Sequence, residues 1–226
     1  MTDASRIVRD SLAVSVATGA YGVSFGAIGV SSGLDVLQTC ALSLLVFTGA
    51  SQFAFVGVVG AGGAPLLGAA SGLLLGVRNA LYGLQLGPLL GWRGVRRTAA
   101  AHLVIDESTA MSVTRDSRDA ARIGFLTTGL GVFTLWNLAT LLGALAGDAL
   151  GDPRAYGLDS AVGGAFLALL WPRLSTRRNR GVAAAAALLA TALVPVAPAG
   201  VPVLAAGAVA LATGLRPGRP GAEDDS

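Results

Sequence analysis

One basic and two acidic residues that lie in or beside apolar sequence have the side chains most able to do chemistry. Arg78 interrupts a long apolar run, and Asp106 and Glu107 lie at the centre of residues 98–114. A charge in hydrocarbon is costly, so ionisable residues at membrane depth are functional candidates. A guanidinium could bind a carboxylate, and the acids could carry a proton, bind an ammonium group or pair with Arg78. The plainer alternatives are a segment broken at Arg78, which then snorkels to an interface, and a solvated turn for the acids.

Uncharged polar residues form a second candidate group within the longest charge-free run. Ser51 and Gln52 belong to the segment FTGASQF, residues 47–53. A buried glutamine has four hydrogen-bonding positions that need partners. One interpretation is a helix break at Gly49 that lines a substrate site. The other is hydrogen bonding between packed helices, which we favour for Thr48.

A polar stripe continues from Arg78. Asn79 follows it directly, and Tyr82 and Gln85 lie on the same face if the segment is helical. Such a stripe could line a cavity. The candidate substrate-binding residues are Ser51, Gln52, Arg78, Asn79 and Tyr82, and the candidate proton-coupling residues are Asp106 and Glu107.

The remaining reactive residues give little support for an enzyme. Ser51 follows Gly49-Ala50 in a loose G-x-S pattern, and with His102 it suggests an intramembrane serine hydrolase as a weak alternative. His102 is the single histidine and lacks the ligand cluster of a metal site, so a hydrogen-bonded structural role is favoured. Cys40 is the single cysteine, which excludes a disulfide scaffold. No phosphate loop, dinucleotide fingerprint or zinc spacing occurs, so we predict no enzyme, no cofactor and no ATP hydrolysis.

Four charge-free stretches determine the fold class. Hydrophobic residues make up 53% of the 226, charged residues 13%, and the mean hydropathy is +0.67. A membrane-spanning helix needs about 20 apolar residues. The net charge of +3 comes from arginines in short loops, which does not indicate nucleic-acid binding. The sequence therefore predicts an all-α, polytopic transmembrane helix bundle. The charge-free stretches are 11–34, 36–77, 123–147 and 181–215.

The expected bundle has about seven spans, uncertain by one, in a domain of residues 11–215. Residues 1–10 form an N-terminal tail and residues 216–226 a disordered C-terminal tail. Arginine-bearing loops should face the cytoplasm, and this rule leaves the first half unbalanced unless it contains discontinuous or re-entrant helices. Residues 98–114 are expected to be re-entrant, interfacial or packed against a polar cavity. The apparent segments are 11–33, 36–60, 64–90, 123–147, 159–172, 181–196 and 199–215.

Several of these motifs together resemble the AzlC-type branched-chain amino acid permeases. The similarity runs through YGVSFG (21–26), SLLVFTGASQF (43–53), VRNALY (77–82) and IDES (105–108), and continues between Asp148 and Pro172. Two departures are Asn79, where the family often has histidine, and the lack of proline before Gly63.

The resemblance implies the large subunit of a two-part exporter of leucine, isoleucine, valine or similar apolar amino acids. Its partner would be a small AzlD-type membrane subunit, and its location a bacterial cytoplasmic membrane. An ion gradient would drive transport, with a proton through Asp106 or Glu107 as the simplest case. The alternatives are transport of another small organic solute and a non-transporting membrane scaffold subunit.

Overall fold

The chain is all-helical in the computed structural model, which describes residues 3–150, 167, 170–171 and 174–214. This confirms the all-α part of the predicted fold class for the described residues. Most of the expected segment 159–172 and the whole tail 216–226 lie outside the described residues. The helices are α1 (Asp3–Ser31), α2 (Val36–Leu45), α3 (Ala50–Gly60), α4 (Pro65–Leu90), α5 (Gly94–Ala101), α6 (Asp106–Val113), α7 (Arg118–Leu150), α9 (Arg177–Leu193) and α10 (Val201–Gly214).

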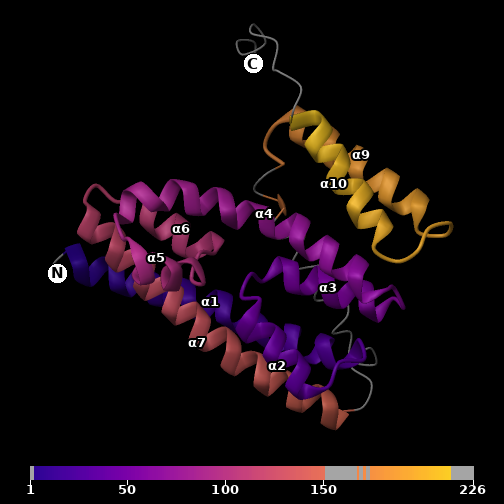
Figure 1. Ribbon diagram of the computed structural model, residues 1–226, viewed down its shortest axis with the longest axis horizontal. Coiled ribbons are helices and arrows are strands. Elements are labelled where there is room, and N and C mark those ends of the chain that lie inside the picture. The colour runs from indigo at the N-terminus through magenta and orange to yellow at the C-terminus, as the bar shows by residue number, and fades with distance from the viewer. Residues whose placement is uncertain (1–2, 151–166, 168–169, 172–173, 215–226) are drawn as a thin grey trace, which may run out of the picture.

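Helices α1 and α7 form the central pair of the fold and lie against each other over most of their length (Figure 1). Glycines make this close approach possible, because a Cβ on Gly22 or Gly26 would overlap the Trp136 or Thr140 carbonyl of α7. Gly143 of α7 meets the backbone of α1 in the same way. Helix α1 runs unbroken through its glycines and begins at Asp3, within the segment assigned to the N-terminal tail.

The apolar segment 36–60 is not one helix. It is divided into α2 and α3 by residues 46–49, at the break that FTGASQF predicts. A second interruption, residues 102–105, divides α5 from α6 within the segment 98–114. The prediction of discontinuous helices in the first half is therefore confirmed, with the first break beside Ser51 and Gln52.

Helix α4 continues without a break from Pro65 to Leu90. The alternative in which this segment is broken at Arg78 is therefore wrong. Arg78 lies at the middle of the helix, where it finds an acidic partner on α6. Figure 1 shows α9 and α10 as a hairpin beyond α4. This hairpin reaches α4 through α10, where a Cβ on Gly207 would overlap Leu74.

Two of the described helices, α1 and α7, are long and apolar enough to cross a membrane on their own. Helices α2, α3, α5 and α6 have only 10, 11, 8 and 8 residues. Since a single spanning helix needs about 20 residues, α2 and α3 reach that length only as a discontinuous pair. The number of spans stays a prediction.

Candidate functional site

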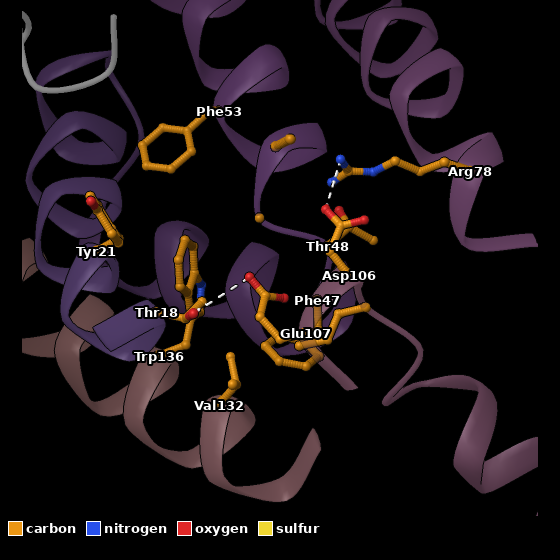
Figure 2. A pocket seen from close by; sticks show the side chains of 13 residues that line it. Thr18, Tyr21, Phe47, Thr48, Phe53, Arg78, Asp106, Glu107, Val132 and Trp136 are labelled. Carbon is orange, nitrogen blue, oxygen red and sulfur yellow. Dashed lines mark hydrogen bonds and ion pairs between the residues drawn. The ribbon is translucent and has the colours of Figure 1, made fainter. Parts of the chain in front are cut away.

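A cavity of about 190 Å³ lies where the two helix breaks meet α1, α4 and α7. It has apolar walls with a few charged and hydroxyl groups, as small-molecule sites generally do. Figure 2 shows its two polar pairs, one between Arg78 and Asp106 and one between Thr18 and Glu107. Its lining residues are Thr18, Tyr21, Phe47, Thr48, Gly49, Ala50, Phe53, Arg78, Ile105, Asp106, Glu107, Val132 and Trp136.

The four short motifs singled out from the sequence, at residues 21–26, 43–53, 77–82 and 105–108, all contribute residues to the lining of this cavity. Tyr21 comes from the first, residues 47–50 and Phe53 from the second, Arg78 from the third, and residues 105–107 from the fourth. These motifs are far apart in sequence, so the fold gathers them at one place.

Gln52 holds the first break in shape. The Gly49 N–H donates to Gln52 Oε1 at 3.1 Å, and Gln52 Nε2 donates to the Leu42 carbonyl at 3.2 Å. The side chain therefore bridges the end of α2 and the start of α3, and it is fully buried. Gly49 has a φ of +61°, a conformation that favours glycine.

Ser108 holds the second break in the same manner. The Ile105 N–H donates to Ser108 Oγ at 3.1 Å, and this hydroxyl donates to the Leu103 carbonyl at 2.6 Å. Asn79 of α4 also stabilises this break, because its Nδ2 donates to the Val104 carbonyl at 3.0 Å. In both breaks, the third residue of the following helix satisfies backbone groups that the interruption frees.

The starts of α3 and α6 both reach the cavity, yet they differ in charge. The first turn of α6 carries Asp106 and Glu107, which suit the partial positive charge of a helix N-terminus. The first turn of α3 has no acidic residue, and Gly49 has no side chain to cap it. The positive end of α3 is therefore left for another negative group.

The two consecutive acids of α6 face different helices. Asp106 Oδ2 lies 2.8 Å from Arg78 Nη1 of α4, so the ion pair foreseen for these residues is confirmed. The side chains are 24% and 27% exposed. The Thr18 hydroxyl of α1 donates to Glu107 Oε1 at a long 3.5 Å. Three polar atoms of the cavity lining are buried with no hydrogen-bond partner: Arg78 Nε, Asp106 Oδ1 and Trp136 Nε1.

Aromatic rings form much of the apolar wall. Trp136 is 4% exposed and packs against Phe25 and Phe53, with ring centroids 6.1 and 6.2 Å apart. Phe47 packs edge-to-face on Phe133 at 5.1 Å. The indole N–H of Trp136 is buried within this packing as a donor without an acceptor.

Of the residues predicted for the site, Arg78, Asp106 and Glu107 line the cavity. Gln52 and Asn79 lie behind the wall, at the two breaks. Ser51 is buried between α3 and α4 with its hydroxyl unpartnered, and a Cβ on Gly76 would lie 3.4 Å from it. Tyr82 packs beside a separate apolar cluster around Leu86 and Phe125.

The hydrolase alternative finds no support in this geometry. Ser51 Oγ has no hydrogen-bond partner, so it is not activated by His102. The His102 ring instead contacts Phe47 and Phe133, with centroids 6.1 and 5.5 Å apart.

Ten of the thirteen lining residues were not among the predicted site residues, including Thr48, for which hydrogen bonding between packed helices was favoured. Three of the ten, Thr18, Val132 and Trp136, also lie outside the motifs singled out from the sequence. Thr18 and Trp136 each carry a hydrogen-bonding group in the middle of a charge-free run, which was an available signal. Nothing in the sequence distinguishes Val132 from other apolar residues of α7.

Comparison with known proteins agrees with the motifs. The family model described as AzlC protein matches residues 13–150, more than half of the chain and all of the cavity lining. No curated protein and no solved structure matches the chain. The chain belongs to the AzlC family, and this membership indicates a membrane protein with a function in transport.

Proposed function

We propose that this chain is the large subunit of a secondary exporter of branched-chain amino acids, such as leucine, isoleucine and valine. It works with a small AzlD-type membrane subunit in a bacterial cytoplasmic membrane. The observation that carries the proposal is the cavity itself, which places acidic groups and free hydrogen-bond donors against aromatic and aliphatic walls.

A zwitterion with an apolar side chain needs three complementary surfaces. Glu107 suits the ammonium group, since it has a negative charge and its hydrogen bond with the Thr18 side chain is long, at 3.5 Å. The start of α3 suits the carboxylate, because its N–H groups point along the helix axis and no acid neutralises them. Phe47, Phe53 and Val132 are left for the hydrocarbon side chain.

Two further donors stand beside the carboxylate position in this proposal. Arg78 gives one guanidinium nitrogen to Asp106 while its Nε stays buried without an acceptor. Trp136 Nε1 is likewise a buried donor without a hydrogen-bond acceptor. A buried donor without a partner costs free energy that a ligand acceptor would recover. Arg78 thus acts on the substrate directly, as the sequence led us to expect.

The other predicted site residues have indirect roles in this proposal. Gln52 and Asn79 position the wall by holding the two breaks. Ser51 fixes the packing of α3 on α4, where its carbonyl approaches Gly72. Tyr82 supports α4 from the neighbouring cluster. A proton gradient drives transport through Asp106 or Glu107, because the chain has no ATP-binding motif.

The test is counterflow of labelled leucine in proteoliposomes that contain this chain with or without the small subunit. Exchange should require both subunits and should fall strongly with Arg78→Ala, although the complex remains assembled. Arg93→Ala is the matched control, since Arg93 is exposed in the loop after α4 and lies outside the cavity.

The contrary outcomes separate the alternatives. Loss of assembly with Arg78→Ala, and no exchange of any solute by the intact pair, would favour the scaffold role. Exchange of a different small organic solute would keep the transporter and change the substrate.

A further inference from the structure

Glu107 is the one charged side chain of the cavity lining without an opposite charge as its partner. The lining has three charged residues, of which Arg78 and Asp106 neutralise each other. Within the described ranges no ion pair includes Glu107, and its hydrogen bond with Thr18 is 3.5 Å long. With all three residues ionised, the cavity has a net charge of −1.

The groups around Glu107 do not supply a cation of their own. From α1 come Thr18 and the phenol of Tyr21, from α7 the indole of Trp136, and from its own helix Asp106. Arg78 of α4 is engaged by Asp106, and the His102 ring of the second break packs against Phe47 and Phe133.

A half-buried carboxylate among apolar walls is costly until something neutralises it. The helix N-terminus offsets only part of this cost. Two small cations can complete the neutralisation: a proton on the carboxyl oxygen, or the ammonium group of a bound amino acid. Both need the same oxygens, so they exclude each other.

We propose that Glu107 is a shared cation site, which holds either a proton or the ammonium group of the substrate, and that this competition couples transport to the proton gradient. The inference rests on the proposed function, in which an apolar amino acid is the substrate. When the ammonium group arrives, the O–H bond of Glu107 breaks and the proton leaves to water. When the amino acid departs on the other side, a proton from that side restores the O–H bond.

Asp106 does not serve this purpose, because a proton there would remove the partner of Arg78 at 2.8 Å. That exchange would leave a guanidinium unpaired in the cavity, which is unfavourable. The two adjacent acids thus have separate roles. Asp106 fixes Arg78 and joins α4 to α6, and Glu107 exchanges its cation.

Leucine binding to the purified two-subunit complex, measured by calorimetry and with a pH indicator in weakly buffered solution, tests the proposal. Where Glu107 is protonated, binding should release about one proton per leucine, and the apparent Kd should rise about tenfold for each pH unit of acidification. Glu107→Gln should abolish proton release, remove the pH dependence and weaken binding about tenfold or more. Asp119→Asn, which removes a carboxylate that is 89% exposed on α7, should behave as wild type.

A second variant covers failure of Glu107→Gln to fold. Glu107→Asp retains the carboxyl group, so it should still release a proton while its pH dependence shifts. Leucine binding without proton release and with a constant Kd between about pH 5 and 8 would overturn the inference but leave the proposed function intact. Equal proton release from Glu107→Gln would also overturn it. Failure of wild type to bind any apolar amino acid would instead overturn the proposed function.

Discussion

Arg78 Nη1 and Asp106 Oδ2 lie 2.8 Å apart, and this ion pair joins the middle of α4 to the first turn of α6. Each side chain is about three-quarters buried, so each charge depends on the other for its stability.

The losses of stability on removing the two members of this pair should not be additive. Arg78→Ala or Asp106→Ala should lower the free energy of unfolding by about 1–3 kcal/mol, because a partly buried charge is left alone. The double variant Arg78→Ala/Asp106→Ala should lose less than the sum of the two. Thermal unfolding in detergent measures the cycle, and simple additivity would show that the pair is not coupled.

Gln52→Ala should destabilise the first helix break. It removes two hydrogen bonds and leaves the Gly49 N–H and Leu42 carbonyl without this partner, which costs about 1–3 kcal/mol. The matched control is Gln85→Ala, at an exposed position of α4, where a change within about 0.5 kcal/mol is expected. Chemical or thermal unfolding of both variants provides the comparison. Equal losses would contradict the role of Gln52 as the bridge.

Gly26→Ala should loosen the contact between α1 and α7. Its new Cβ would lie against the Thr140 carbonyl and within 2.6 Å of the Ala144 nitrogen, neither of which can move without the helix. Overpacking of this kind costs about 1–3 kcal/mol. Gly57→Ala is the control, because nothing lies within 4 Å of the added carbon and alanine favours a helix by about 1 kcal/mol. Melting temperatures should move in opposite directions for the two variants.

Trp136→Phe should separate stability from binding. The variant keeps an aromatic ring against Phe25 and Phe53 and removes a buried N–H that has no acceptor, so stability should be unchanged or slightly higher. If the indole N–H binds the substrate carboxylate, the Kd for leucine should rise about tenfold. Leucinamide, which lacks the carboxylate, should bind both proteins alike. An equal loss for both ligands would assign the effect to packing.

The first helix break could be predicted because a glycine and hydrogen-bonding residues stand together inside apolar sequence, at residues 47–53. The Arg78 and Asp106 pair could be anticipated for an equally simple reason, since charges in an apolar domain need partners. The second break was indicated only indirectly, because Asp106 and Glu107 make residues 98–114 unsuited to a lone spanning helix. Leu103, Val104 and Ile105 themselves resemble a helix interior.

The wall of the cavity could be predicted only in part. The sequence indicates that Gln52 and Asn79 need hydrogen-bond partners, but not that these are backbone carbonyls at the breaks rather than a ligand. Thr18 and Trp136 face the cavity because the glycine contacts between α1 and α7 fix the rotational orientation of each helix about its own axis. That rotation depends on long-range packing, which periodicity along one helix does not reveal.

The glycine contacts between α1 and α7 also bear on how this protein can evolve. At Gly22, Gly26 and Gly143 the helices meet backbone to backbone, so no side chain there is free to vary. The Val132 and Trp136 side chains belong to the same α7 yet face the cavity. The positions that fix the packing of α1 on α7 therefore differ from the positions whose side chains contact a ligand. Selection can change the side chains of the cavity while the contact between the two helices stays the same.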